Sequence, residues 1–199
     1  MAFRREERAP APGLPAEEGS KEGYRDGMQG LFRGGPLTLK VARSPRHKRV
    51  GVSRRGDILH LQAGLHHRRG ELEAALARWY RKEARRVLTE RVKEYAALMG
   101  VTYKKVFIKD QKTRWGSCSR QGNLNFNFRL VMAPDEILTY LVVHELCHRV
   151  HPNHSKAYWA LVESYYPRCR EARKWLREQG SALQGELFKE RGRGKHGGY

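Results

Sequence analysis

The segment His-Glu-Leu-Cys-His at residues 144–148 constrains the fold of this 199-residue chain more than any other stretch. It is preceded by an apolar run at 137–143 and by Pro134, a residue that favours the first position of a helix. Side chains four positions apart lie on one face of a helix, so His144 and His148 can bind the same metal ion. The segment therefore predicts a helix over about 134–150 that carries two metal ligands.

His154 is the candidate for a third ligand. Pro152 restricts the residue before it to extended geometry, which ends the helix and lets the chain turn back toward the two histidines. Three neutral imidazoles would leave one position open on a zinc ion, as a catalytic site requires, with one Zn²⁺ per chain. Two alternatives remain for the third ligand: His151, near the same helix end, and Glu163, which would follow the glutamate-type zincin pattern.

Glu145 follows the first histidine directly and suits the role of general base. Zinc lowers the pKa of a bound water toward ~7 and polarises a carbonyl, and a glutamate beside it can move a proton from water to a leaving amine. This is the chemistry of peptide-bond hydrolysis. A structural zinc needs no base, so the intact Glu145 favours a zinc peptidase over the alternative of a metal-stabilised scaffold without activity.

The surrounding residues exclude some classes of site. The histidine spacing equals that of metzincins, but His151 stands where those enzymes have a glycine. No methionine follows Met132, so their downstream Met-turn is also excluded. Three cysteines without a Cys-x-x-Cys pair predict reduced thiols, and Cys118 and Cys147 are expected to be packed side chains rather than ligands.

The sequence predicts an α+β fold in four parts. Residues 1–36, with scattered Pro and Gly and no periodicity, predict a disordered N-terminal segment. Short alternating runs predict a β-rich part at 37–70, followed at 71–180 by the domain that holds the histidines. The Gly-, Arg- and Lys-rich stretch at 181–199 predicts a basic flexible tail.

Within the third part, the lack of Gly and Pro over 71–99 predicts a long helix that Gly100 ends. Residues 104–109 predict a strand, and strict alternation over 123–130 predicts a half-buried one. A further helix is expected from about residue 155 to just before Pro167. The predicted architecture is a metal-site helix packed on a short antiparallel or mixed sheet, preceded by β-strands and a long helix.

The chain is strongly basic, with 40 Lys and Arg against 21 Asp and Glu and a net charge of +19. The surplus is spread along the sequence as +6 over 1–60, +8 over 61–115 and +5 over 116–199. A dedicated DNA site would concentrate the positive charge in one region, and this chain does not. A DNA-associated protease or a DNA-binding protein with a diffuse basic surface is therefore kept only as the alternative interpretation. No apolar stretch approaches the ~20 residues that span a bilayer and no secretory signal is readable, which predicts a cytoplasmic protein.

Four segments together resemble one known family. They are DQKTRWGSCS at 110–119, GNLNFNFRL at 122–130, VHELCH at 143–148 and NHSKAYW at 153–159. The chain resembles the YgjP-like metallopeptidase family, a more distant relative of the SprT-like proteases. The resemblance covers about 79–180 and, loosely, 37–65, but not 1–36 or 181–199. Cys147 replaces an alanine usual in the family, and Tyr158 is a second small departure.

The resemblance implies a small zincin-type domain that acts on proteins or peptides. It implies zinc on His144, His148 and His154, with Glu145 as general base. It also places four residues on a strand and turn near the metal: Arg114, Trp115, Gly116 and Ser117. One interpretation is that an edge strand here pairs with an extended peptide substrate. The other is that Trp115 packs the floor of the site and Gly116 serves a turn or bulge.

Overall fold

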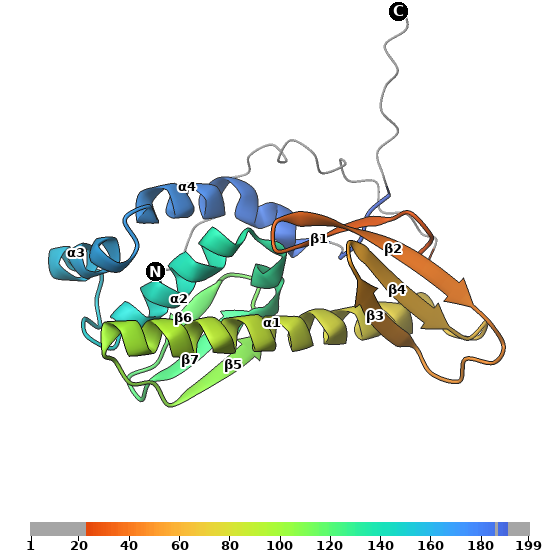
Figure 1. The fold of residues 1–199 in the computed structure, drawn as a ribbon, viewed down its shortest axis with the longest axis horizontal. Helices are drawn as coiled ribbons and strands as arrows, with labels where there is room; N and C mark the ends of the chain where they lie inside the picture. The colour runs from red at the N-terminus through yellow and green to blue at the C-terminus, as the bar shows by residue number, and fades with distance from the viewer. Residues whose placement is uncertain (1–22, 186, 191–199) are drawn as a thin grey trace, which may run out of the picture.

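The computed structural model describes residues 23–185 and 187–190. In this part of the chain, four α-helices and two small sheets form an α+β fold, as the sequence predicts. Figure 1 shows an elongated molecule with the four-stranded sheet at one end and the three-stranded sheet with most of the helices at the other. One continuous apolar core includes buried residues from both ends.

The four-stranded sheet comes first in the chain. Its strands are β1 (Gln29–Phe32), β2 (Gly35–Arg43), β3 (Gly51–Arg55) and β4 (Ile58–Ala63), in the order β1-β2-β4-β3. The β2–β4 pair is parallel and the other two pairs are antiparallel. Alternate leucines of β2 and β4 are fully buried, and this alternation is the sequence pattern that predicts strands here. The buried leucines are Leu37, Leu39, Leu59 and Leu61.

Strand β1 corrects the expectation of a disordered segment over 1–36. Residues 23–36 are described and include β1, the turn after it and the start of β2, whereas residues 1–22 lie outside the described residues. The Phe32 ring packs 5.4 Å from the ring of Trp79, and Tyr24 and Met28 are also buried. The apolar side chains of this stretch are too widely spaced to show a period, and only the tertiary contacts show that they are core.

Helix α1 (Arg69–Met99) confirms the predicted long helix. The Glu71 carboxylate accepts a hydrogen bond from the Arg68 backbone N–H at 2.9 Å, which satisfies a donor at the N-terminus. Gly100 ends the helix in the left-handed conformation, at φ 64°. Figure 1 shows α1 running along most of the length of the molecule, and its buried face contacts both sheets.

The three-stranded sheet consists of β5 (Lys105–Lys109), β6 (Gly116–Cys118) and β7 (Asn123–Asn127), in the order β5-β7-β6. Strand β5 pairs parallel to β7, and β6 pairs antiparallel to it. The strand expected over 123–130 ends earlier, because residues Phe128–Met132 form a 3₁₀-helix, η1. The Asn127 side chain accepts a hydrogen bond from the Arg129 N–H and starts this turn.

Three further helices complete the fold: α2 (Asp135–Cys147), α3 (Lys156–Tyr165) and α4 (Cys169–Gln179). Helix α2 is almost wholly buried and ends at Cys147, earlier than expected. The sequence did not predict α4, which is rich in Arg and Lys and buries only Cys169 and Ala172. No helix in 23–185 combines the length and the apolarity that crossing a membrane would take.

The C-terminal segment corrects the expectation of a flexible tail over 181–199. Residues Gly180–Gln184 form the short 3₁₀-helix η2, and Leu187 and Phe188 are buried. The backbone of Lys189 exchanges two hydrogen bonds with Gln29 of β1, at 2.7 and 2.9 Å. Burial of these two apolar side chains fixes the segment against the edge of the sheet, and residues 191–199 lie outside the described part.

Candidate metal centre

Three histidines meet at the C-terminal end of α2. His144 lies in its last turn, His148 follows the helix directly, and His154 lies in the loop before α3. One ring nitrogen from each lies within 4.8 Å of the others. The Nε2 atoms of His144 and His154 are 3.4 Å apart. Two ligands at ~2.0–2.1 Å from a tetrahedral zinc are separated by roughly this distance, so the donor set fits such an ion.

The protonation of these histidines also suits metal binding. Burial is the main cause that lowers the pKa of His144 to about 3, and the proximity of the titratable rings of His148 and His154 acts in the same direction. Burial is likewise the main cause that lowers the pKa of His148 and of His154. All three rings are therefore neutral near pH 7. The His148 Nδ1 atom lies 3.2 Å from the His151 carbonyl oxygen, so Nδ1–H donates there and Nε2 keeps its lone pair for a ligand bond.

Aromatic side chains hold the three imidazoles in place. The ring of Tyr158 stacks on His148 at 4.6 Å between centres, and its hydroxyl donates to the His144 carbonyl oxygen at 2.9 Å. The ring of Trp159 stacks on His154 at 5.6 Å. Both aromatics come from the first turn of α3, where the Ser155 hydroxyl accepts a hydrogen bond from the Tyr158 N–H. Helix α3 thus supports the histidines through the rings of Tyr158 and Trp159.

Glu145 is buried next to the histidines, with 3% of its surface exposed. Burial raises the pKa of its carboxyl to about 8, while the positive charge of Arg114 acts in the opposite direction. The carboxylate lies against the backbone of Gly116, the first residue of β6. A Cβ atom at Gly116 would collide with Glu145 Oε1 and lie 3.0 Å from its Cδ and Cγ atoms. The absence of a side chain at Gly116 therefore allows the close approach of the carboxylate to β6.

The histidines and Glu145 line one cavity of about 310 Å³. Its walls come from the segment before β6, from β6 itself, from α2 and the loop after it, and from α3 and α4. Trp115 lines the cavity and also packs against Gly180, so it serves as part of the wall. Arg114, Gly116 and Ser117 line it too, so all four residues singled out before and in β6 lie together beside the histidines.

Among the described residues, strand β6 is an edge of its sheet, and its hydrogen-bonding pattern shows which backbone groups do not face β7. The Trp115 carbonyl accepts from the Asn127 N–H, and the Ser119 N–H donates to the Asn123 carbonyl, both at 2.9 Å. Backbone groups alternate between the two sides of a strand. The N–H and C=O groups of Gly116 and Cys118 therefore point away from β7, to the open edge.

The other ligands considered from the sequence lie outside the group of three. The backbone carbonyl of His151 faces His148, and the Glu163 carboxylate pairs with Arg170 at 3.3 Å. Cys147 is buried, and burial raises the pKa of its thiol to about 12. Cys118 lines the cavity half-buried, and burial raises its pKa as well. None of these four belongs to the metal-binding group found among the described residues.

Two polar side chains of the cavity, Tyr140 and Arg173, were missed in the sequence. Tyr140 lies one turn before His144, and its hydroxyl is 3.4 Å from the His144 Nδ1 atom. The i−4 spacing on α2 was a signal that could have identified it. Arg173 enters the cavity from α4, and nothing in its local sequence distinguishes it from the other basic residues of that helix.

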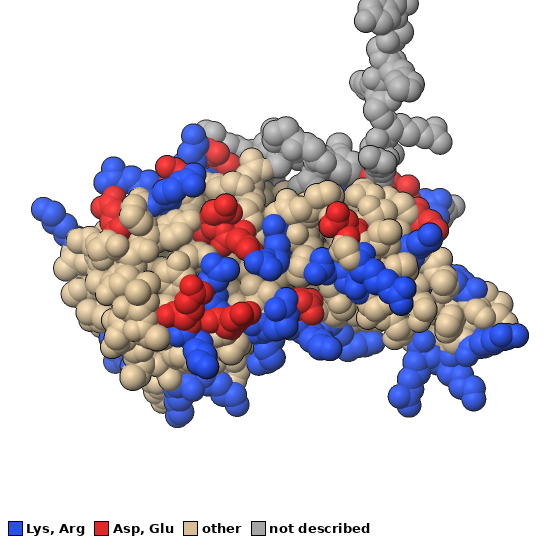
Figure 2. Space-filling model, in the orientation of Figure 1, with Lys and Arg blue, Asp and Glu red and all other residues tan. Residues whose placement is uncertain are grey.

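The basic charge is less evenly spread in space than along the sequence. Figure 2 shows acidic and basic side chains mixed over α1, and mainly basic ones at the outer end of the four-stranded sheet. The exposed members in β2, β3 and the connection between them are Lys40, Arg43, Arg46, Lys48, Arg49, Arg54 and Arg55. The regional sum over 1–60 conceals this group, because acidic residues earlier in the chain offset it.

Comparisons with known proteins give one family match and a partial similarity to solved structures. The model of the YgjP-like metallopeptidase domain matches residues 10–179, so the family domain includes the N-terminal sheet that the sequence resemblance covered only loosely. The crystal structure of the metallopeptidase zymogen abylysin from Pyrococcus abyssi is 21% identical, with a TM-score of 0.42 over 45% of this chain and 90% of that one. The zymogen of jannalysin from Methanocaldococcus jannaschii is 23% identical, with a TM-score of 0.41 over 45% and 92%.

A search of curated proteins gives no match. The family match spans most of the chain and includes the three histidines, Glu145 and the cavity-lining strand. Its members are peptide hydrolases that depend on a metal ion, and the cavity offers a set of donors for one. The chain belongs to the YgjP-like metallopeptidase family.

Proposed function

We propose that the protein hydrolyses peptide bonds with one zinc ion held by His144, His148 and His154, and with Glu145 as general base. The observation that supports this most directly is the convergence of three neutral imidazole nitrogens beside a buried carboxylate in one cavity. A zinc bound there would supply a Lewis acid that polarises the scissile carbonyl and acidifies water. Three protein ligands leave one coordination position for substrate or water.

Glu145 performs the proton transfer in this proposal. Its carboxylate takes a proton from the attacking water and delivers it to the amine nitrogen that leaves. Burial raises the pKa of Glu145 to about 8, and the positive charge of a zinc ion held beside it would favour the ionised form that accepts a proton near pH 7. The contact with Gly116 fixes the carboxylate at the edge of β6, where the substrate backbone would lie.

The open edge of β6 positions the substrate. The free backbone groups of Gly116 and Cys118 can hydrogen-bond to an extended peptide, which would add a strand to the sheet. Arg114, Trp115 and Ser117 contribute side chains to the same wall of the cavity. Pairing along β6 would hold the scissile bond next to Glu145. The substrate would then be bound in the orientation that the reaction needs.

Zinc content and cleavage of an unstructured protein, measured on the same preparations, test this proposal. Wild type and Glu145→Gln should each hold about one zinc, since the carboxylate is not a ligand, but only wild type should cleave. His154→Ala should lose zinc and activity. His151→Ala is the matched control and should keep both, because its ring lies outside the group of three.

The outcomes separate the parts of the proposal. Tight zinc in His154→Ala would show that the ligand set is wrong. Cleavage by Glu145→Gln at the wild-type rate would show that another group is the base. Zinc binding by every variant with no cleavage by wild type would leave a metal-stabilised scaffold.

A further inference from the structure

Arg173 is a basic side chain of the cavity that the proposed hydrolysis does not use. Its guanidinium carbon lies 4.1 Å from the centre of the Trp159 ring. Trp159 itself stacks on His154, with ring centres 5.6 Å apart. Arg173 is half-buried and lines the same cavity as the histidines. Its charge is thus held one aromatic ring away from the proposed metal ligands.

Within the described part of the chain, the Arg173 guanidinium has no carboxylate or carbonyl partner. Arginines that are buried to a similar degree do have oxygen partners: Arg81, Arg91, Arg129 and Arg149. The acidic side chain of Glu163, on the neighbouring helix, pairs with Arg170 instead. A half-buried guanidinium that keeps unused N–H donors in a cavity is prepared for an anion from outside.

The surroundings favour a carboxylate as that anion. A guanidinium presents a planar set of N–H groups that match the two oxygens of a carboxylate, and stacking on an indole restricts its orientation. Arg114 adds a second positive charge on the β6 side of the cavity. The cavity therefore attracts a negatively charged group from both sides.

We propose that Arg173 binds a carboxylate of the peptide substrate and makes the enzyme prefer bonds that lie next to one. The carboxylate belongs either to an Asp or Glu side chain or to the C-terminus of the peptide. This inference rests on the proposed function, because it assumes that the scissile bond lies at the histidines. An extended peptide advances ~3.3 Å per residue, so a group one ring away can reach the residue that flanks the bond.

The test uses synthetic peptides that share one neutral sequence. A single Glu, or Gln as its neutral match, is placed at successive positions, and each peptide is made with a free and with an amidated C-terminus. Values of kcat/KM are measured for wild type, Arg173→Gln, Arg173→Lys and Lys174→Gln. Lys174 is the matched control, because it is an exposed cation of the same helix that does not line the cavity.

Wild type should cleave the best-placed Glu peptide roughly tenfold to a hundredfold faster than its Gln match, as a charged hydrogen-bonded pair allows. Arg173→Gln should lose this ratio and keep its rate on the neutral peptide, and Arg173→Lys should restore part of it. Lys174→Gln should behave as wild type. A ratio that follows the free C-terminus rather than the Glu side chain identifies the terminal carboxylate as the ligand.

The proposal is overturned if wild type cleaves the Glu and Gln peptides equally, whether their C-termini are free or amidated. This result would leave the proposed function intact. An equal loss on all peptides in Arg173→Gln also overturns it, since that pattern belongs to a catalytic or packing role. Binding is measured separately by fluorescence anisotropy of labelled peptides on Glu145→Gln protein, with and without Arg173→Gln. If wild type cleaves no peptide, the proposed function fails. The binding measurement then decides this inference: the Glu peptide should bind more tightly than the Gln peptide, and Arg173→Gln should remove the difference.

Discussion

The carboxylate of Glu145 has little free space on its β6 side. It is buried against the backbone of Gly116, and any side chain at that position would occupy the place of its Oε1 atom. Gly116 does not need a left-handed backbone, since it is absent from the glycines with positive φ among the described residues. The glycine of the Trp-Gly-Ser sequence is thus explained by the proximity of the Glu145 carboxylate and not by a turn.

Gly116→Ala should inactivate the enzyme without unfolding it. The added methyl group collides with the end of a flexible side chain, so Glu145 can rotate away at small cost to stability but loses its position as base. We expect kcat/KM to fall roughly a hundredfold to ten thousandfold, the usual contribution of a general base, with zinc content unchanged. Peptide cleavage and zinc analysis on the same sample measure both quantities.

Gly51→Ala is the control for this substitution. Gly51 also begins an edge strand, but a Cβ there would meet only the Gln62 side chain, at an ordinary contact distance of 3.5 Å. Its activity should equal that of wild type. Full activity of Gly116→Ala would mean that Glu145 has room to stay in place and that the close contact does not constrain it.

At the level of the element, β6 contributes an unpaired strand edge to the cavity. The backbone of Ser117 faces β7 by the alternation of the pairing, and its hydroxyl accepts a hydrogen bond from the Asn125 amide at 3.2 Å. Cys118 and Gly116 carry the groups that face outward. Of the two, Cys118 permits a backbone test, because Gly116 cannot be changed without displacing Glu145.

Cys118→Pro removes one outward N–H donor, whereas Cys118→Ala removes the thiol and keeps the donor. Loss of one backbone hydrogen bond to substrate should raise KM about twofold to tenfold in the proline variant, with kcat nearly unchanged. The alanine variant should show the wild-type KM. Steady-state kinetics on a peptide substrate, with thermal unfolding to confirm the fold, measure the effect. The same KM in both variants would exclude pairing at this residue.

Elements with a strong local pattern could be predicted from the sequence, and those defined by distant contacts could not. The 71–99 helix has an apolar stripe and a glycine stop, and α1 follows it closely. Strand β1 and the 187–190 segment are ordered by contacts with each other across almost the whole chain, which no local period encodes. Helix α4 has so few buried residues that its composition resembles that of a solvated tail.

The candidate site shows the same division. His144 and His148 stand four residues apart in a short motif, a helical spacing that already implies a common face, and the structure brings them together with His154. Arg173 reaches the cavity only because α4 packs beside α2, an arrangement visible in Figure 1. The proposed role of Arg173 follows from tertiary packing and from the absence of an internal partner in the described part of the chain. The local sequence around Arg173 predicts neither property.

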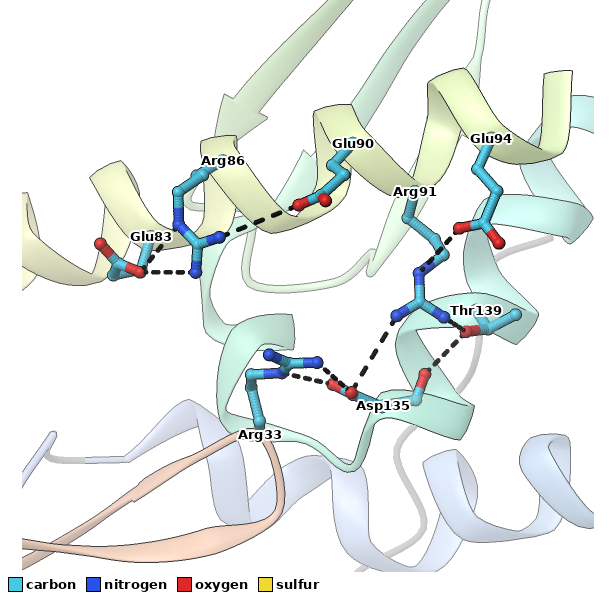
Figure 3. Close-up of polar contacts among 8 residues, drawn as sticks. All are labelled: Arg33, Glu83, Arg86, Glu90, Arg91, Glu94, Asp135 and Thr139. Carbon is cyan, nitrogen blue, oxygen red and sulfur yellow. Dashed lines mark hydrogen bonds and ion pairs between the residues drawn. The ribbon is translucent and has the colours of Figure 1, made fainter. Parts of the chain in front are cut away.

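At the scale of the whole molecule, the two ends are connected by α1 and by a polar cluster at the start of α2. Arg33, in the β1–β2 turn, donates from Nε to Asp135 Oδ1 at 2.7 Å and forms a second bond from Nη2 to Oδ2. Arg91 of α1 lies 4.0 Å from the same carboxylate and donates to the Thr139 hydroxyl at 2.6 Å. Figure 3 shows Asp135 between these two arginines, so one carboxylate links the N-terminal sheet, α1 and α2.

This cluster predicts a pH-dependent contribution to stability. The hydrogen bond from Arg33 is the main cause that lowers the pKa of Asp135, and the charge of Arg91 acts in the same direction. A lowered folded-state pKa means that the stabilisation is present above the unfolded value of ~3.9 and is lost as the pH falls through the folded value. Because both partners are more than a third exposed, solvent screening limits the effect to about 1 kcal/mol.

Asp135→Asn should therefore lower the free energy of unfolding by about 1 kcal/mol at pH 7, and its difference from wild type should shrink as the pH falls below about 4. Glu136→Gln is the control, because it removes the same charge from the same helical turn at an exposed residue. It should differ little from wild type at any pH. Denaturant unfolding of the three proteins over pH 7 to 3 provides the measurement. A difference for Asp135→Asn that stays constant over this range would show that packing, and not the charge, connects the two ends at this point.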